Sequence, residues 1–308
     1  MSVTANWRRL LAILLASLSS LFGLAGAAHA AIDVGDDAGR RIVLQQPARR
    51  VISMAPHVTE LLFAAGAGAR IVGAMNFSDF PPAAQQIPLI GSNDQIDIER
   101  VIALRPDLLI VWQSGNTARQ IEQLRQLGVP MFFSEPHRLD DVATSMLRFG
   151  QLLGSAPAAQ AAAAAYRQKI AALAARYAAR PVVRVFYQIW DKPLYTLNGQ
   201  HIVSDALRVC GGQNIFGALG VVAPAVGIEA VLAADPEVIL GGERHDPADA
   251  GINLWRAYRS LLAVQRGNLF TLDGELLTRA GPRIADGTAV LCEKLDLARQ
   301  RRGQGGVK

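Results

Sequence analysis

Five aromatic side chains in the expected loops are the residues best suited to bind a ligand. They are Phe77, Phe80, Trp112, Trp190 and Tyr195, and each lies at or after the end of a short apolar run. Aromatic residues make up only 6% of the chain, so their gathering in a few loops is selective. Rings in loops predict a large, flat, apolar ligand held by stacking and by burial of surface. Each ring taken alone would serve equally well in a hydrophobic core.

Polar groups join the same rim after the last expected strand. In open α/β sheets, ligands bind beyond the carboxyl ends of the strands, so we expect this segment and the rings to line one cleft. The guanidinium of Arg279 suits an acidic or amide-rich edge of the ligand. The segment consists of Glu275, Leu276, Leu277, Thr278 and Arg279.

Sequence motifs for catalysis are missing. The chain has no G-x-S-x-G nucleophile turn, no Walker A loop and no His-Glu-x-x-His helix. Gly66 and Gly68 follow an expected helix and precede an expected strand, which is the reverse of a dinucleotide-binding fingerprint. We therefore expect neither an enzyme nor a cofactor.

Metal binding is a competing prediction. His57, His137 and His201 lie in expected loops of both halves, and Glu275 would supply a carboxylate. Three imidazoles and one carboxylate are a ligand set that suits zinc or manganese. His57 would alternatively face a metal held inside a macrocycle. Each histidine alone would serve as an ordinary loop or capping residue.

Two glutamates occupy matching positions in a repeated segment. Residues 97–111 read DIERVIALRPDLLIV and residues 227–241 read GIEAVLAADPEVILG. The copies begin 130 residues apart, about one domain's length, which predicts two similar α/β lobes with a cleft between them. Glu99 and Glu229 would each lie at a helix start, where the helix dipole stabilises an acid. Paired carboxylates on two lobes would also suit paired arginines on a dimeric partner.

Short apolar runs alternate with helical stretches in the order typical of a parallel sheet. In each half, a first strand is followed by a helix that ends at glycine. Thr59 and Ser204 are expected near the starts of these two helices, and each is followed by an acidic residue. The expected strands are 50–54, 71–74, 108–112 and 131–134 in the first half and 184–188, 238–240 and 269–272 in the second.

An alanine-rich segment, residues 155–180, separates the halves. Alanine has the highest helix propensity, so this segment predicts one helix of about 22 residues, roughly 33 Å long. A disordered linker is the alternative, but Tyr166, Ile170, Leu173 and Tyr177 recur at helical spacing and supply a face to bury. A rigid connecting helix predicts a small hinge motion rather than wide closure.

The first thirty residues have the parts of a secretory signal. Arg8 and Arg9 precede an apolar stretch, and Ala28-His29-Ala30 is a small-x-small cleavage site. We expect cleavage near Ala30 and a periplasmic protein, with an uncleaved membrane anchor as the alternative.

Net charge and cysteine content give little information about function. Without Arg8 and Arg9 the chain carries 29 basic and 26 acidic side chains, an excess too small to indicate a nucleic-acid partner. The two cysteines are Cys210 and Cys292. An even count in an oxidising compartment favours one disulfide over two buried thiols.

Several motifs resemble one known family over nearly all of the chain beyond residue 30. They are Ser78-Asp79-Phe80-Pro81-Pro82, residues 98–108, Gly115-Asn116 with Arg119-Gln120, residues 209–216, and Arg279-Ala280 with Pro282-Arg283-Ile284. On these residues the chain resembles the periplasmic cobalamin-binding proteins of bacterial ABC importers, a family that also includes haem and ferric siderophore binders.

The resemblance implies roles for particular residues. Glu99 and Glu229 match two acids that dock the binding protein onto arginines of a dimeric permease, and Cys210 and Cys292 match a disulfide of the family. Phe77 takes the place of an aromatic that contacts the corrin. Trp112, Tyr195 and residues 275–279 match further ligand-contacting positions.

The chain departs from the resemblance at two cleft positions. Asn93 and Ala223 stand where a relative in the family has tryptophans, while Trp190 is an aromatic gained. Losing two stacking surfaces weakens binding of a corrin unless Trp190 or Phe80 compensates.

We therefore expect a class III periplasmic binding protein-like α/β fold, with two similar parallel-sheet lobes joined by one long rigid α-helix. The expected division is a signal peptide at 1–30, an N-terminal lobe at 31–150, a connecting helix at 151–180 and a C-terminal lobe at 181–308. The expected function is that of a monomeric extracytoplasmic protein that captures cobalamin or a related corrinoid for an ABC permease. Haem, a ferric siderophore or a metal ion is the alternative cargo.

Overall fold

The protein contains two four-stranded parallel sheets with the same topology. We describe residues 31–93, 95–242 and 250–303 of a computed structural model, so the expected signal peptide and its cleavage site lie outside the described residues. The first sheet has the order β4-β3-β5-β6 and the second β10-β7-β11-β12. In both sheets, the strand that is second along the chain forms one edge, followed by the first, the third and the fourth. The strands are β3 (Val51–Ser53), β4 (Ile71–Ala74), β5 (Leu108–Trp112), β6 (Met131–Ser134), β7 (Val183–Gln188), β10 (Gly212–Asn214), β11 (Val238–Gly242) and β12 (Leu269–Leu272).

The sequence duplication therefore extends to the architecture, and the predicted α/β fold class is confirmed. Every pairing within these two sheets is parallel. The core strands are apolar on both faces, as expected where helices cover a parallel sheet on both sides. In β5, for example, four of the five residues are buried. The boundaries of the two lobes remain the division proposed above.

Two hairpins and one edge strand were not predicted. β1 (Ile32–Gly35) pairs antiparallel with β2 (Arg41–Leu44), and β8 (Trp190–Asp191) pairs with β9 (Leu194–Tyr195). The edge strand β10 reads Gly-Gln-Asn, which has no β-branched or aromatic residue. It is a strand because β7 offers it a hydrogen-bonding edge, a property of tertiary structure.

Helices cover both sheets, and two predicted helix starts were wrong. α2 begins at Pro56, which suits the first turn because proline lacks the N–H that has no acceptor there. Thr59 lies inside α2 and donates to Ser53 Oγ at 2.7 Å. α7 begins at Ile202 rather than Ser204, and His201 Nδ1 caps it by accepting from Val203 N at 3.2 Å. The helices are α2 (Pro56–Ala64), α3 (Ile98–Ala103), α4 (Ala118–Arg125), α5 (Leu139–Leu152), α6 (Ala156–Tyr177), α7 (Ile202–Val209), α8 (Ile228–Ala234), α9 (Leu262–Gln265), α10 (Gly274–Thr278) and α11 (Ile284–Arg302), with 3₁₀ turns at Gly68–Arg70, Pro82–Gln86 and Gly251–Ala257.

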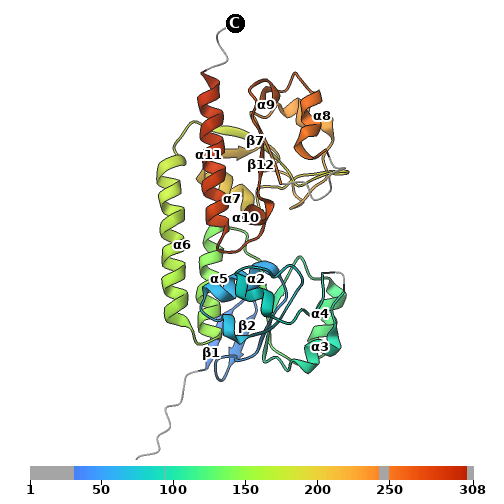
Figure 1. The fold of residues 1–308 in the computed structure, drawn as a ribbon, viewed down its shortest axis with the longest axis vertical. Coiled ribbons are helices and arrows are strands. Elements are labelled where there is room, and N and C mark those ends of the chain that lie inside the picture. The colour runs from blue at the N-terminus through green and yellow to red at the C-terminus, as the bar shows by residue number, and fades with distance from the viewer. Residues whose placement is uncertain (1–30, 94, 243–249, 304–308) are drawn as a thin grey trace, which may run out of the picture.

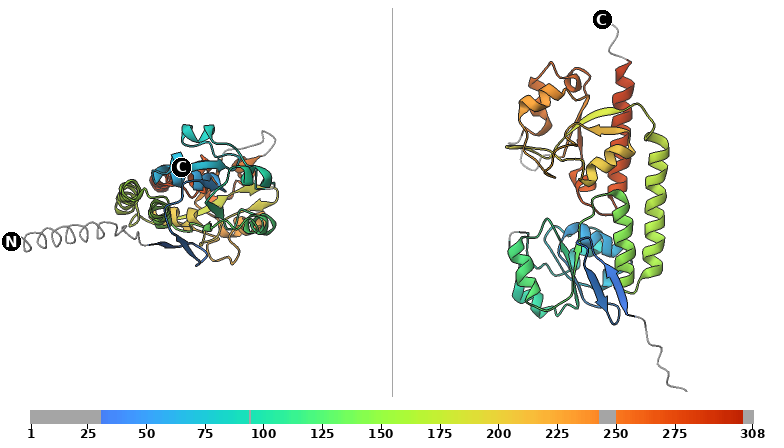
Figure 2. Two further views of the ribbon diagram at one scale, coloured as in Figure 1. Left: turned by 90° about the horizontal axis from the view of Figure 1, so that it is seen from below. Right: turned by 180° about the vertical axis from the view of Figure 1, so that it is seen from behind.

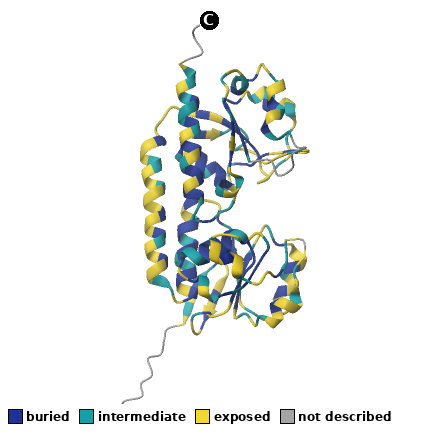
Figure 3. Ribbon diagram, viewed as in Figure 1, coloured by how far each residue is buried: buried dark blue, intermediate teal, exposed yellow. Residues whose placement is uncertain are grey.

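The alanine-rich segment forms α6, a helix of 22 residues. It runs along the side of both lobes, next to α5 and α11 (Figure 1; Figure 2, right). The inward face buries Ala159, Ala163, Tyr166 and Tyr177, and the outward face is exposed (Figure 3). Small residues on the inward face let α6 approach α5 closely.

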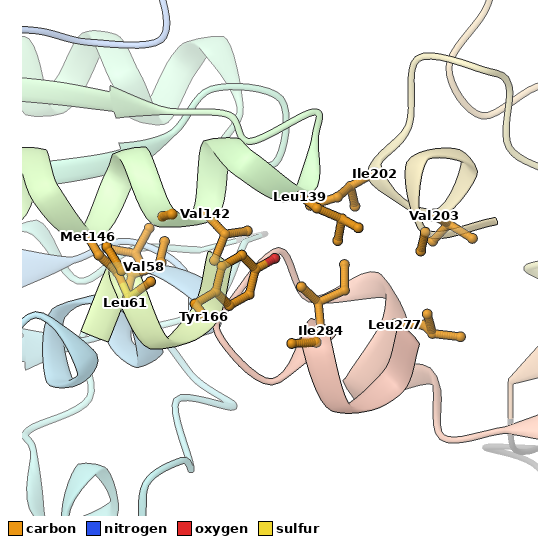
Figure 4. Packing of buried hydrophobic residues seen from close by; sticks show 14 of the residues in the cluster. Val58, Leu61, Leu139, Val142, Met146, Tyr166, Ile202, Val203, Leu277 and Ile284 are labelled. Carbon is orange, nitrogen blue, oxygen red and sulfur yellow. The ribbon is translucent and has the colours of Figure 1, made fainter. Parts of the chain in front are cut away.

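One hydrophobic cluster connects the two lobes. Val58 and Leu61 of α2 belong to it together with Ile202 of α7 and Ile284 of α11, and Tyr166 of α6 lies between them (Figure 4). Separating the lobes would expose this apolar surface, at a cost of about 25 cal/mol per Å². We therefore expect only a small movement of one lobe against the other.

The predicted disulfide is confirmed. Cys210, directly after α7, is bonded to Cys292 of α11, with a sequence separation of 82 residues and 4.6 Å between the Cα atoms. It ties the last helix to the second lobe. Within the described part of the chain, no helix combines the length and apolarity that crossing a bilayer requires.

Candidate ligand-binding site

The loops at the carboxyl ends of the two sheets face each other. Asp79, after β4, accepts a hydrogen bond from Arg279, after α10, with 2.9 Å between Oδ1 and Nη1. At a second point, Leu139 N at the start of α5 donates to Asp205 Oδ2 of α7 at 2.8 Å. These contacts bring together the ends of the sheets where ligands of α/β proteins bind.

The second lobe carries a pocket of about 240 Å³ at the ends of β7, β11 and β12. Trp190, Glu275 and Thr278 of the predicted site line it, and so do Asp191 and Asp273, whereas no residue of the first lobe belongs to its described lining. Among the described residues of its lining there is no lysine, arginine or histidine. The described lining is therefore rich in hydrogen-bond acceptors, and it includes the carboxylates of Asp191, Asp273 and Glu275, the last of them paired with Arg279.

The two predicted rings of the second lobe lie side by side. Trp190 and Tyr195 are directly opposed across the β8–β9 hairpin, so their side chains leave the same face. Both rings are more than one-third exposed. The Trp190 indole N–H donates to Lys192 O at 3.2 Å, which limits its rotation.

The rings of the first-lobe loop project outward. Phe77 is 75% exposed and has a φ of 67°, in the left-handed region that a bulky residue rarely adopts. Such backbone strain gathers at functional sites, where the surrounding structure holds it. Phe80 is 40% exposed, and the guanidinium carbon of Arg283 lies 4.2 Å from the centre of its ring.

Trp112 is held in place by its neighbours along the chain. Asn116 Oδ1 accepts from Trp112 N at 2.9 Å, and Gly115 lies against the indole. A Cβ at Gly115 would come within 1.9 Å of the ring, so only glycine permits this packing. The ring of His57 meets the indole edge-on, with 5.4 Å between the centroids. His57 is only 5% exposed.

The alternative of a metal site is wrong for the described residues. Nowhere among them do three or more His, Cys, Asp or Glu side chains come together in a way that would hold an ion. His57 packs against Trp112, His201 caps α7, and Glu275 forms an ion pair with Arg279. His57 is 5% exposed, so tertiary packing keeps its imidazole from a ligand shared with the other histidines, and His201 is half-buried at the start of α7.

The segment 275–279 separates into three roles. Leu277 is 1% exposed and lies in the cluster that connects the lobes, so we remove it from the proposed site. Glu275 and Thr278 line the pocket, whereas Leu276 is only partly exposed. Arg279, predicted to meet the ligand, binds Asp79, Glu275 and Glu60 of the protein itself.

Sequence reasoning missed five charged groups of this region, namely Asp79, Arg283, Asp191, Asp273 and Glu60. Asp79 and Arg283 lay within quoted motifs, and Asp191 lay between two predicted rings, so proximity to those motifs was a usable signal. Glu60 was assigned to a helix start. It is instead 3% exposed and bonded to Arg283, a partner 223 residues away that no local pattern indicates.

Glu99 and Glu229 occupy matching surface positions. Each is the second residue of its helix, α3 or α8, and each is exposed. Neither carboxylate forms an ion pair with another described residue. Both helices lie on the side of the molecule away from α6 (Figures 1 and 2). The two carboxylates are therefore available to a partner that spans both lobes.

Comparison with known proteins decides the family. A model of the family described as periplasmic binding protein matches residues 51–276. This chain belongs to the periplasmic binding protein family. Among its relatives is the vitamin B12-binding protein of Vibrio cholerae, 37% identical over 256 residues, which cover 83% of this chain and 92% of the relative.

Solved structures support the same family assignment. The crystal structure of the periplasmic vitamin B12 binding protein of Vibrio cholerae matches with a TM-score of 0.75 and 37% identity, covering 82% of this chain and 98% of that one. A periplasmic heme binding protein from Pseudomonas aeruginosa matches with a TM-score of 0.68 and 28% identity, covering 80% and 91%. The predicted resemblance and the class III periplasmic binding protein-like fold are thus confirmed.

Acid should destabilise this periplasmic binding protein through two histidines. Burial lowers the pKa of His57 to about 4, with the charge of Arg279 adding to the effect, and burial together with His137 lowers the pKa of His201 to about 4. The unfolded chain binds these protons below pH ~6.5 and the folded chain only near pH 4, so stability falls as the pH falls through this window. Between pH 7.5 and 5.0 each histidine should remove about 2 kcal/mol.

Urea denaturation at the two pH values measures this effect. His201→Asn keeps an acceptor at the helix cap but cannot be protonated, so its loss between pH 7.5 and 5.0 should be about 2 kcal/mol smaller than that of the wild type. An unchanged pH dependence in this variant would contradict the assignment to His201.

Proposed function

We propose that this periplasmic binding protein captures cobalamin or a related corrinoid in the cleft between its lobes and delivers it to an ABC permease. No bond is made or broken in this function. The observation that carries the proposal is the combination of outward rings on the first lobe with an acceptor-rich pocket on the second. A flat macrocycle with hydrogen-bond donors at its edge complements both surfaces.

The charge of the pocket favours a corrinoid over haem. Corrinoids carry carboxamide side chains, whose N–H groups donate hydrogen bonds, whereas haem carries propionates. Asp191 and Asp273 accept from amides and repel carboxylates, whereas the charge of Glu275 is balanced by Arg279. Asp191 Oδ2 is buried and has no hydrogen-bond partner, which leaves an acceptor for a ligand donor.

Trp190, the aromatic that this chain has gained, lies near Ala223, one of the two positions where a relative has tryptophan. Tyr195, the cross-strand partner of Trp190, forms a bridge with Ala225, two residues from Ala223. The indole of Trp190 therefore lies on the same rim as the position where a relative has tryptophan. This supports compensation for the stacking surface missing at Ala223. Asn93 is exposed.

Delivery involves the two exposed glutamates. We infer that Glu99 and Glu229 bind arginines on the two halves of a dimeric permease, since they occupy equivalent positions on two equivalent lobes. The carrier acts as a monomer, with each lobe meeting one half of the permease. The periplasmic location follows from the family, and cleavage near Ala30 remains part of this proposal.

Calorimetric titration with cobalamin, cobinamide and haem tests the ligand. Cobalamin or cobinamide should bind with a Kd below about 1 µM, and haem at least about tenfold more weakly. Tighter binding of haem than of either corrinoid would overturn the proposal in favour of a haem carrier.

Asp191→Asn tests the role of the pocket charge. This change should weaken cobalamin binding about three- to tenfold, because a charged acceptor is lost. It should also reduce the difference in affinity between cobalamin and haem. Asp33→Asn is the matched control, because Asp33 is an exposed aspartate of the β1–β2 hairpin, paired with Arg41 outside the pocket. Equal effects of the two changes would remove Asp191 from the site.

A further inference from the structure

A cluster of ion pairs joins the first lobe to the segment between α10 and α11. Glu60 of α2 accepts two hydrogen bonds from Arg283, at 2.5 Å from Nη2 and 3.1 Å from Nε. Arg279 Nη1 lies 3.6 Å from the same carboxylate and 2.9 Å from Asp79 Oδ1. Two arginines from one segment therefore bind two acids of the first lobe.

Glu60 is positioned to hold Arg283 rigidly. Its carboxylate is buried and would be unfavourable there without a cation, so the pair is coupled to the folding of α2. A bidentate contact also fixes the plane of the guanidinium, which a single hydrogen bond does not. Gly281 permits the approach, since a Cβ there would lie 2.8 Å from Glu60 Oε2.

The fixed guanidinium supports a ring of the proposed cleft. Arg283 lies over the face of Phe80, with 4.2 Å from its Cζ to the ring centre. Phe80 is 40% exposed, so apolar packing covers only part of the ring. A planar cation over an aromatic face attracts the ring through its quadrupole and restricts its rotation.

We propose that Arg283 is a positioning residue for Phe80, and that Glu60 fixes Arg283 in the orientation that this requires. The inference rests on the proposed function, because it treats Phe80 as a wall of the ligand cleft. The arginine comes from a segment whose flanking helices, α10 and α11, pack on α7 of the second lobe, while the ring belongs to the first lobe. The orientation of the ring is thus coupled to the spacing of the two lobes.

A double-mutant cycle between Arg283 and Phe80 tests the proposal. Arg283→Lys keeps the charge but loses the bidentate contact and the planar stacking. It should weaken cobalamin binding about five- to tenfold in the wild-type background and less than about twofold in Phe80→Leu. Glu60→Gln should resemble Arg283→Lys. Equal losses with and without the ring would show a general structural effect and overturn the proposal.

Arg167→Lys is the matched control. Arg167 forms a bidentate pair with Asp140 between α6 and α5, at 2.6 and 3.0 Å, and neither residue lines the pocket or contacts Phe80. This change should leave cobalamin affinity unchanged. Thermal unfolding of all variants confirms that each is folded at the temperature of the titration.

A ligand-free measurement separates this proposal from the proposed function. In protein labelled with 4-fluorophenylalanine, the ¹⁹F resonance of Phe80 is assigned by its loss in Phe80→Leu. Arg283→Lys should shift and narrow this resonance, whereas Arg167→Lys should not. An unchanged resonance in Arg283→Lys overturns the positioning role, while a wild-type protein that fails to bind any corrinoid overturns only the proposed function.

Discussion

Reversing the charge of both Glu99 and Glu229 is expected to abolish corrinoid uptake while leaving the ligand affinity of the isolated protein unchanged. Both side chains are exposed at the second position of equivalent helices, and neither has an ionic partner among the described residues. Each would meet an arginine of the permease, and losing one such pair at an interface costs about 2 to 5 kcal/mol. Two reversals, which also add repulsion, should lower docking affinity by far more than a hundredfold.

Uptake of labelled cobalamin by cells, with the double variant as their sole copy of the protein, measures this effect. The matched control reverses one exposed acid in each lobe elsewhere, Asp33→Lys in β1 and Glu293→Lys in α11. The control should support normal uptake, because exposed charges contribute little to stability. Normal uptake by the Glu99 and Glu229 variant would eliminate the docking assignment.

Removing the disulfide is expected to cost the protein about 4 to 5 kcal/mol of stability. Cys210 and Cys292 are fully buried, and their bond closes a loop of 82 residues. The closed loop lowers the conformational entropy of the unfolded chain. The bond attaches α11 to the end of α7, and α11 also carries Arg299, whose guanidinium donates to Cys210 O at 2.7 Å. Loss of the bond should therefore loosen the last helix from the second lobe.

Urea denaturation of the Cys210→Ala, Cys292→Ala double variant, with and without reductant, measures this cost. Reductant should lower the midpoint of the wild type towards that of the variant and should not move the variant itself. Wild-type stability in the double variant would mean that packing of α11 alone holds the second lobe together.

Local pattern predicted much of the fold. β4, β5, β6 and β12 match the predicted residues because each is a short apolar run bounded by turn-forming residues, and such a run needs no distant information. α6 followed from its alanine content and from the helical spacing of its larger apolar residues. β10 and the β8–β9 hairpin were missed, because their residues become strands only when a neighbouring backbone pairs with them.

Local sequence pattern also indicated part of the candidate site. The exposed rings of Phe77, Trp190 and Tyr195 were recognisable because aromatic residues are rare in this chain and follow strand ends. Leu277 was misplaced, since five consecutive residues were treated alike although a helical turn directs one of them into the core. The metal alternative failed because residues in loops of both lobes were counted together without knowing which of them are buried.

The sequence by itself determined the two lobes, the helix that runs beside them, the export signal as an expectation, and the pair of matched glutamates. Apolar periodicity and helix propensity depend on a few neighbouring residues, and an internal repeat is visible when the sequence is compared with itself. All three can therefore be recognised without a structure. Only the tertiary structure decided that Arg279 and Arg283 bind Asp79 and Glu60 instead of remaining free for a ligand. These partners are about 200 residues apart, and the energy of an ion pair depends on the distance between its charges and on their burial, which exist only once the lobes have packed.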